Sequence, residues 1–501
     1  MSDASALGAY RALPRAVPYA ERWVFAAIVL VALAERAIIE TAPDVSWLLT
    51  LGERLLAGER PYIDFIEVNP PASIFLYLPA LVLARVSGLS PEFMVGLLVF
   101  AGTGASLGFS ARVLVKGGVI ESRSAWPLAS AFAVVLLVLP AATFAQREHI
   151  ALISFLPFIA CAALRAQNKP VAWSAAIVAG LGAALTAIIK PHFIFPVLFV
   201  AATAAFYARS WRPLFALENW ISATLALLYG AAVIMFYPEF IHDWVPIITA
   251  VYVAQKASLI DLFTLGAIPF WLGGLLVIVA MKRRAAFAPP FVLLLAASTG
   301  FFASFFAQQK GLPYHSYPML ALIFANAIVA AFDRAPQARQ SPAMFIGALI
   351  AIAGLHFATF SWYAVTVDTR AIAAPIRAAV VRPKILNISG GGLVGMGFPL
   401  TRQLEGTWVG RTCGQWISAG VLAAKMRGVD AETKAKLDRY MALDLKILVE
   451  DIRNGKPDII LADRNHYDWY KWAQRDAVLA HELENYRPLA EVESVLILRR
   501  K

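Results

Sequence analysis

The side chains best suited to acid–base chemistry lie together in one acidic stretch, from Glu40 to Pro71. A carboxylate can take a proton from an attacking hydroxyl, and several carboxylates together can bind a divalent cation such as Mg²⁺ or Mn²⁺. The acidic residues around the short predicted amphipathic helix of this stretch and its Pro-Pro end are Asp44, Glu53, Glu59, Asp64 and Glu67. This pattern predicts chemistry at one edge of the apolar part of the chain.

The carboxylates differ in what we expect of them. Asp44 stands at the predicted helix start, where capping the helix is the alternative to a chemical role. Glu53 and Glu59 are expected to be solvated. Asp44, Asp64, Glu67 and the later Glu148 are the candidates for catalysis. Their spacing does not require a metal, so we predict no metal site, and a divalent cation stays an open alternative.

A second set of polar side chains lies at the ends of long apolar segments. Its members are Arg147, Glu148, His149, Lys190, His192, Lys310, Tyr314 and His315. Cationic side chains of this set can bind a phosphate. The alternative is that each charged side chain only extends from the end of a membrane helix into water and has no binding role. Because all of them fall on one side of the membrane in the topology derived below, we expect a common polar cavity.

These residues belong to a strongly apolar chain. Of its 501 residues, 59% are hydrophobic and 15% are charged, and the mean hydropathy is +0.65. Such values exclude an ordinary soluble globular protein and predict a polytopic membrane protein. The net charge of +11 comes from short Lys and Arg clusters between apolar runs, and no long basic patch indicates nucleic-acid binding. Cys161 and Cys413 show no zinc-binding spacing, and we expect no disulfide between them.

Eleven apolar runs are long enough to cross a bilayer, for which about 20 residues are needed. They lie at about 22–39, 92–113, 126–144, 149–165, 171–189, 193–208, 217–236, 263–280, 287–307, 316–332 and 343–363. Arg11, Arg15 and Arg22 before the first run are also typical of a cleavable signal peptide, but apolar character resumes at residues 37–39 and favours a membrane helix.

Charge decides the topology. Residues 72–88 are an ambiguous apolar run, and placing them along the membrane surface brings the basic connections to one face. Those connections contain Arg112, Lys116, Arg165, Lys169, Arg209, Arg212, Lys282, Arg283, Arg284, Arg334 and Arg339. The expected location is a bacterial inner membrane, and the positive-inside rule then puts the N-terminus (1–21) on its cytoplasmic side. Residues 22–365 form the membrane domain, with the 40–91 loop and the C-terminal region on the periplasmic side.

Residues 366–501 predict a soluble α/β domain, because charge rises and the apolar runs shorten. We expect strands at 384–389, 458–462 and 494–500, and helices at 430–453 and 466–482. Gly390–Gly395 matches the glycine pattern of a dinucleotide-binding turn. Met-Gly-Phe-Pro follows instead of a helix, so a plain glycine-rich loop is the prediction.

Four stretches, in order along the chain, resemble GT-C glycosyltransferases of the branch that includes protein O-mannosyltransferases and lipid A aminoarabinose transferases. Asp44 and the following LLAGERPYIDFIEVNPPASIFLYLPALVLARVSG resemble the first external loop of that family. FAQREHIALISFLPFIACAALR resembles the start of its fourth span, GLGAALTAIIKPHFIFPVLF its lysine motif, and GLPYHSYPMLALIFANAIVAAFD a later motif. The resemblance covers residues 20–335 and implies a GT-C-like fold with external juxtamembrane helices.

The resemblance also implies roles. Asp44 matches the catalytic acid of the family, Glu148 the second acid and Lys190 the lysine of its motif. Arg147, His149, His192, Lys310, Tyr314 and His315 would bind the donor phosphate or line its pocket. The chain departs from the family at Val45, where the family often has Glu, and at Asn69, where it commonly has Lys. Asp64 or Glu67 is the candidate to replace the missing acid.

The function that this resemblance implies is inverting transfer of a sugar from a polyprenyl-phosphate donor to a glycan, lipid or protein acceptor outside the membrane. Asp44 would act as the general base. The alternative is a transporter or flippase of a lipid-linked saccharide. A transporter commonly shows internal repeats or paired broken helices, and we find no convincing repeat.

Overall fold

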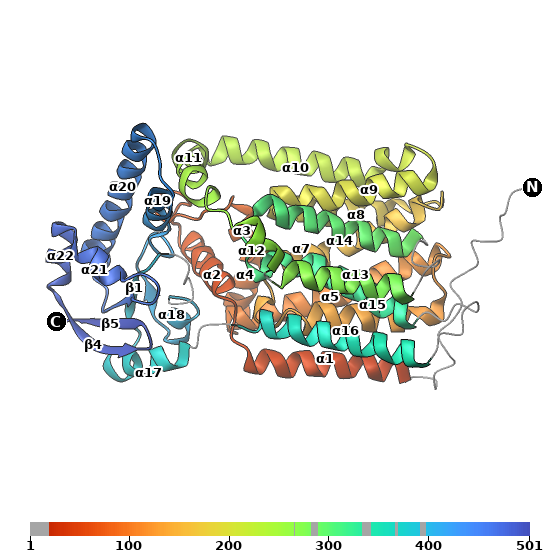
Figure 1. Cartoon of the computed structure of the whole chain (residues 1–501), viewed down its shortest axis with the longest axis horizontal. Coiled ribbons are helices and arrows are strands. Elements are labelled where there is room, and N and C mark those ends of the chain that lie inside the picture. Colours follow the sequence, from red (N-terminus) through yellow and green to blue (C-terminus); the bar gives the residue numbers. More distant parts are fainter. Residues whose placement is uncertain (1–19, 265, 282–288, 333–341, 366–368, 391–396) are drawn as a thin grey trace, which may run out of the picture. The chain divides into compact units, whose positions relative to one another are not determined.

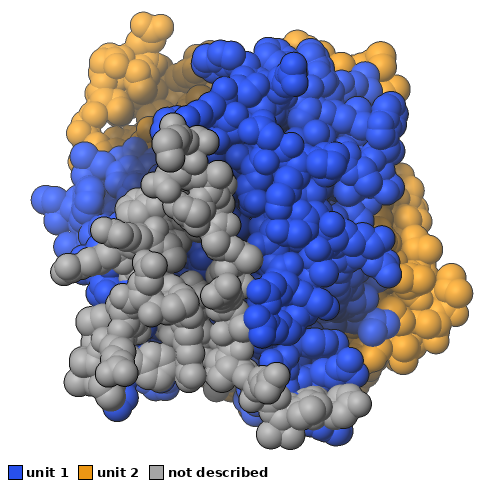
Figure 2. All heavy atoms as spheres, turned by 90° about the vertical axis from the view of Figure 1, so that its right-hand side faces the viewer, with its two compact units in different colours: residues 1–40, 95–230, 257–365 blue, residues 41–94, 231–256, 366–501 orange. Residues whose placement is uncertain are grey.

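A computed structural model describes residues 20–264, 266–281, 289–332, 342–365, 369–390 and 397–501 (Figure 1). The chain divides into two compact units, each made of three segments (Figure 2). Unit 1 contains residues 1–40, 95–230 and 257–365, and unit 2 contains residues 41–94, 231–256 and 366–501. The sequence-based boundaries grouped the 40–91 loop with the membrane helices, whereas in the structure residues 41–94 cluster with the C-terminal segment.

Each of the eleven apolar runs predicted to cross the membrane forms a helix. These are α1 (Ala20–Ile38), α5 (Pro91–Lys116), α6 (Ala125–Ala133, continued by the π-helical η3, Val134–Val138), α7 (Arg147–Arg165), α8 (Trp173–Ile189), α9 (Ile194–Ala208), α10 (Leu217–Phe236), α13 (Ala267–Met281), α14 (Pro289–Gln308), α15 (Tyr317–Phe332) and α16 (Pro342–Tyr363). Within the described ranges, six helices are long and apolar enough to cross a bilayer by length and composition alone. The protein is a multi-pass membrane protein, as the composition predicts.

Shorter elements connect these helices. They are η2 (Ser122–Ser124), η4 (Ala141–Thr143), η5 (Pro191–Phe193), η6 (Arg212–Phe215), α12 (Leu259–Thr264) and η10 (Pro313–Ser316). The polar side chains predicted to form a cavity lie in or beside η5 and η10 and at the start of α7.

Helix α7 is the central helix of unit 1. Nearly all of its side chains are buried, and it packs against α8, α9, α14 and α15 (Figure 1). A β-carbon at Gly182 of α8 would stand 2.0 Å from the backbone oxygen of Ser154 in α7. Only glycine therefore permits this approach. Because the two helices are antiparallel neighbours, the start of α7 lies beside the end of α8, which brings Glu148 to Lys190.

The 40–91 loop folds into short helices of unit 2. They are α2 (Pro43–Leu56), α3 (Ala72–Phe75) and α4 (Leu78–Ser87). Gly88 ends α4 in the left-handed conformation, at φ +73°. Helices α3, with 4 residues, and α4, with 10, lie within one short apolar helical stretch, Ala72–Ser87. The placement of residues 72–88 along the membrane surface stays a prediction. Residues 240–253, also in unit 2, form the short helices η7 (Phe240–Trp244), α11 (Val245–Ile247) and η8 (Ile248–Val253).

The C-terminal segment forms a five-stranded mixed sheet with helices. Its elements are α17 (Thr369–Ala379), β1 (Lys384–Ile388), α18 (Leu400–Gln403), β2 (Thr407–Trp408), α19 (Trp416–Met426), α20 (Ala431–Gly455), β3 (Ile459–Asp463), α21 (Trp469–Gln474), α22 (Ala477–Leu483), β4 (Tyr486–Val492) and β5 (Val495–Arg500). The strand order is β2-β1-β3-β5-β4. Strands β2, β1 and β3 are parallel, with Ile385 opposite Ile459, and β5 runs antiparallel to β3 and β4. Leu386, Ile460 and Leu498 are buried in the core of this sheet.

The α/β prediction is confirmed, with three differences. Helices α17, α18 and α19 were not predicted. The single helix predicted at 466–482 is wrong: it is divided into α21 and α22, because the Asp476 carboxylate accepts a 2.9 Å hydrogen bond from the Leu479 amide and caps a new helix. Strands β2 and β4 were not predicted. Strand β2 has only two residues. β4 is an edge strand with an irregular register between Pro488 and Ala490, which weakens its alternating pattern.

Candidate functional site

Asp44 lies in the first turn of α2, in unit 2. The helix is preceded by Ala42 at its N-cap, Pro43 occupies the first turn, and no side chain caps the helix. The alternative that Asp44 serves as the N-cap is therefore wrong. Its half-buried carboxylate lies where the helix dipole stabilises a negative charge. The local sequence thus places a half-buried carboxylate in the first turn of α2.

Glu67 is the buried acid of the same stretch, with 4% of its surface exposed. It accepts a 2.7 Å hydrogen bond from the Trp47 indole. It also accepts bonds from the backbone amide of Asn69, at 3.1 Å, and from the Asn69 side-chain amide. At Asn69, the position where the GT-C family commonly has lysine, this chain therefore has a side chain that donates a hydrogen bond to the Glu67 carboxylate.

The remaining carboxylates of the stretch have local or structural partners. The Asp64 carboxylate, whose side chain is 40% exposed, accepts a 2.7 Å bond from the Arg60 amide and closes a turn. Glu59 accepts a 2.7 Å bond from Arg54. Glu53 accepts two bonds from Arg402, at 2.8 and 3.0 Å. The Glu53 and Glu59 side chains are 39% and 37% exposed, as expected of solvated carboxylates, and both are also ion-paired.

Cys413 lies near two of the candidate acids, Asp44 and Glu67. Burial raises the pKa of the Cys413 thiol, and the negative charges of Glu67 and Asp44 raise it further. The segment is fixed to the sheet, since the Asn387 side chain donates a 3.1 Å bond to the Cys413 carbonyl. Gln415 supports it by accepting a 2.7 Å bond from the Ser389 amide. The carboxyl end of β1 therefore holds residue 413 beside Asp44 and Glu67.

This arrangement predicts an unreactive thiol at Cys413. An unperturbed cysteine has a pKa of about 8.5, and each unit of increase lowers the thiolate fraction about tenfold at a pH below that value. We expect iodoacetamide to modify Cys413 at least tenfold more slowly than a free thiol at pH 8, with the inflection of the pH–rate profile above pH 9. Mass spectrometry of a Cys161→Ser background measures this rate.

Glu67→Gln removes one nearby negative charge and should move that inflection to lower pH. Glu405→Gln is the control, because Glu405 pairs with Arg382 at an exposed site. An unchanged pH–rate profile in Glu67→Gln would contradict the proximity of Glu67 to Cys413.

A second cluster lies in unit 1, at the start of α7 and the end of α8. Lys190 and Glu148 form a buried ion pair, with side chains 6% and 1% exposed. The Nε2 atom of His315, just before α15, lies 3.8 Å from the same Glu148 oxygen. The Lys190 ammonium also lies 5.6 Å from the centre of the Tyr314 ring. Four residues predicted to share a cavity are therefore brought together.

The electrostatic balance of this cluster is positive. Burial lowers the pKa of His315 well below its usual value, and the charges of Lys190, Arg147 and Lys310 are among those that lower it further. His315 is therefore neutral at pH 7, and Glu148 is the acid paired with Lys190. An excess of cationic groups at a membrane edge suits a phosphate.

The two other predicted histidines have different surroundings. The His192 ring bonds to Gln308 of α14, and the His192 carbonyl accepts a 2.9 Å bond from Ser304. His149 is fully buried. Its Nδ1 accepts a 3.0 Å bond from the Ala145 amide, so its Nε2 donates to the Leu136 carbonyl, at 2.7 Å. Both ring nitrogens of His149 are thus engaged by the backbone.

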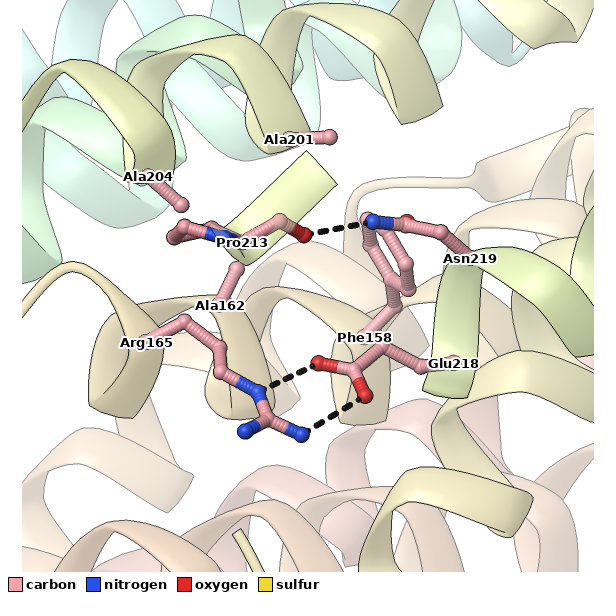
Figure 3. A pocket seen from close by; sticks show the side chains of 8 residues that line it. All are labelled: Phe158, Ala162, Arg165, Ala201, Ala204, Pro213, Glu218 and Asn219. Atoms are coloured by element: carbon pink, nitrogen blue, oxygen red, sulfur yellow. Dashed lines mark hydrogen bonds and ion pairs between the residues drawn. The ribbon is translucent and has the colours of Figure 1, made fainter. Parts of the chain in front are cut away.

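Two arginines of unit 1 with buried partners were not predicted as site residues. Arg36 of α1 donates to the Ala141 carbonyl, at 2.7 Å, and stacks over Phe144. Arg165 forms a paired hydrogen bond with Glu218, at 3.0 and 3.1 Å, in a small pocket (Figure 3). Asn219 in the same pocket donates to the Pro213 carbonyl. Because Glu148 and Arg165 are at opposite ends of α7, about 26 Å apart along the helix, this pocket is separate from the Lys190 cluster.

Some sequence predictions fall outside the described residues. Most of the glycine-rich loop does, namely residues 391–396. So do Arg11, Arg15, Lys282, Arg283, Arg284, Arg334 and Arg339. Within the described part of the chain, no group of three or more His, Cys, Asp or Glu side chains is placed to hold a metal ion.

Solved structures share this fold. Two of them are ArnT from Cupriavidus metallidurans bound to undecaprenyl phosphate and ArnT from the same organism in the apo state. Each has a TM-score of 0.56 at 14% sequence identity, with 96% of this chain and 98% of the ArnT chain covered. No protein-family model and no curated protein sequence matches the chain. The expected architecture, a polytopic helical domain with a C-terminal α/β domain, is confirmed, and its fold is shared with ArnT.

Proposed function

We propose that the protein is an inverting glycosyltransferase that moves a sugar from a polyprenyl-phosphate donor to an acceptor outside the membrane. Two observations together carry the proposal. The fold is shared with an ArnT whose structure contains undecaprenyl phosphate, and unit 1 holds a buried, cation-rich cluster around Lys190, Glu148 and His315. A lipid phosphate at a membrane edge needs such cations, because negative charge develops on it as the sugar leaves.

Asp44 is the proposed general base. Its carboxylate takes the proton of an acceptor hydroxyl as that oxygen attacks the anomeric carbon of the sugar. The bond between this carbon and the phosphate oxygen breaks, and the electron pair leaves with the polyprenyl phosphate. A single displacement of this kind inverts the anomeric configuration. Glu67, whose charge acts with that of Asp44 on Cys413, is preferred over the exposed Asp64 as the second carboxylate.

The donor phosphate is assigned to unit 1. Lys190 would contact it directly, with Arg147 and Lys310 adding positive charge and His192, Tyr314 and His315 lining the pocket. Glu148 holds Lys190 in place through their ion pair. We leave His149 out of this group, because both of its ring nitrogens bind backbone atoms.

A transfer assay tests the proposal. The purified protein, in liposomes, is given undecaprenyl-phosphate-linked sugars with a radiolabel in the sugar, and a cell-envelope extract supplies the acceptor. We expect labelled product together with free undecaprenyl phosphate. Translocation of the labelled lipid with no product would contradict the proposal and support a flippase. A parallel reaction with EDTA tests the divalent-cation alternative.

The periplasmic side is the proposed location of the chemistry. The positive-inside rule, applied to the eleven predicted spans, assigns the 40–91 loop, the 237–261 loop and the C-terminal domain to the same outer side. Residues 41–94, 231–256 and 366–501 form one compact unit. Three segments that are distant in sequence and predicted to lie outside thus pack together, which supports the topology.

Reporter fusions test this topology. Alkaline phosphatase, which is active only outside the cytoplasm, is expected to be active when fused after Lys501 and silent when fused after Ser210, in the connection between α9 and η6. Green fluorescent protein fused at the same positions should give the opposite pattern. A silent phosphatase after Lys501 together with an active one after Ser210 would overturn the proposed orientation.

A further inference from the structure

One arginine of the α/β domain binds α2, the helix that carries Asp44. Arg402 of α18, with its side chain 12% exposed, donates two hydrogen bonds to Glu53 of α2, at 2.8 and 3.0 Å. Its Nε atom donates to Glu92, and its Nη1 atom lies 3.5 Å from the Thr50 hydroxyl. One guanidinium therefore joins α2, the start of α5 and the α/β domain within unit 2.

Two further contacts hold α2 on the same domain. Phe398 lies between Trp47 of α2 and Trp408 of β2, with ring centres 5.2 and 4.8 Å away. Arg54, at the end of α2, donates a 2.8 Å bond to the Gly410 carbonyl. The helix is thus fixed at its middle and at its end.

The loop after α2 is held in the same way. The Ile66 amide donates a 2.7 Å bond to the Arg411 carbonyl. Arg411 is anchored in turn on α20, where Asp451 accepts bonds from its backbone amide and its guanidinium, at 2.8 and 2.7 Å. Since Glu67 follows Ile66 directly, the α/β domain sets the position of the second carboxylate as well.

These contacts matter because α2 is a short rigid rod. Glu53 and Asp44 are nine residues apart, which is about 14 Å along a helix. A tilt of the helix at Glu53 therefore displaces Asp44. A misplacement of about 1 Å between a catalytic group and the reacting atoms can slow a reaction by about 100-fold.

We propose that Arg402 is a positioning residue, through which the α/β domain sets the place of Asp44 in α2. The inference rests on the proposed function, in which Asp44 takes the proton of the acceptor. It assigns the C-terminal domain a part in the reaction itself: the domain aligns the base with the acceptor hydroxyl and contributes no reacting group through this contact.

Kinetics of variants test the inference. Arg402→Ala should lower kcat about 10- to 100-fold and change the KM for the lipid-linked donor by less than about twofold, because the proposed donor residues belong to unit 1. Arg402→Lys keeps the charge but loses the paired bonds, and should fall between Arg402→Ala and the wild type. Arg382→Ala is the matched control, since its ion pair with Glu405 is in the same domain but exposed, and we expect wild-type kinetics.

A double variant separates positioning from general damage. If Arg402 acts through Asp44, Arg402→Ala in an Asp44→Asn background should cause no further loss in single-turnover transfer. An equal loss in both backgrounds would overturn the inference. If Arg402→Ala does not fold, Glu92→Ala, which removes one contact of Arg402, replaces it, with an expected several-fold loss of kcat and the same dependence on Asp44.

The two proposals fail in different ways. Normal kcat in a folded Arg402→Ala protein, with Asp44→Asn impaired, would overturn the positioning role and leave the glycosyltransferase proposal standing. Near-normal transfer by Asp44→Asn would overturn the proposed base, and the positioning role with it.

Discussion

Replacing Asp44 with asparagine is expected to reduce the rate of sugar transfer by about 100- to 10,000-fold, the usual contribution of a general base. The amide is nearly the same size as the carboxylate but cannot take a proton from the acceptor hydroxyl. Binding of the lipid-linked donor should change little, since the proposed phosphate cluster is in unit 1. Single-turnover transfer of a labelled sugar measures the rate, and thermal unfolding checks that the variant folds.

Glu59→Gln provides the matched control for this experiment. It removes a carboxylate from the same acidic stretch, but one that is 37% exposed and paired with Arg54. We expect transfer within about twofold of the wild type. Near-normal transfer by the Asp44→Asn variant would contradict the assignment of Asp44 as the base, whatever the control shows.

Replacing Lys190 with methionine is the second change with a large expected effect. It removes the cation proposed to bind the leaving phosphate, which should lower transfer by at least about 100-fold. It also leaves Glu148, 1% exposed, without its ion-pair partner, and breaking a buried pair in this way costs about 3–5 kcal/mol of stability. Transfer kinetics and the midpoint of thermal unfolding measure the two effects.

A double replacement separates the two effects of Lys190. Lys190→Met combined with Glu148→Gln removes both charges of the buried pair, so stability should largely return. Activity should not return, because the phosphate still lacks its cation. Lys169→Met is the control, since this lysine bonds the Gly118 carbonyl at an exposed site among the connections predicted to face the cytoplasm. Recovery of transfer in the double variant would contradict the phosphate-binding role.

The membrane helices could be predicted from the sequence because their signal is local. A run of about 20 apolar residues has few alternatives to a bilayer-crossing helix, since its backbone must be hydrogen-bonded within the segment. The strands at residues 384–388 and 459–463 were predictable for a similar reason, as short apolar runs in a polar region. The division of residues 466–482 was not predicted, although its signal, a capping aspartate at residue 476, is also local.

The candidate site was predictable only in part. Residue type and the resemblance to a family singled out Asp44, Glu148 and Lys190, and the ends of the predicted helices indicated which polar residues share a side. The resemblance also placed His149 among the phosphate ligands, where the structure engages both of its nitrogens with backbone atoms. Periodicity carries no information on the hydrogen bonds of a single buried ring.

The sequence by itself determined that this is a polytopic membrane protein with a C-terminal α/β domain and an acidic loop beside its first helix. Only the tertiary structure decided the partners of the charges. It pairs Glu53 with Arg402, 349 residues away, and it buries Glu67 on Trp47 and Asn69. The physical reason is that the length of an apolar run can be read from neighbouring residues. An ion pair between distant segments forms only once packing has brought their backbones together.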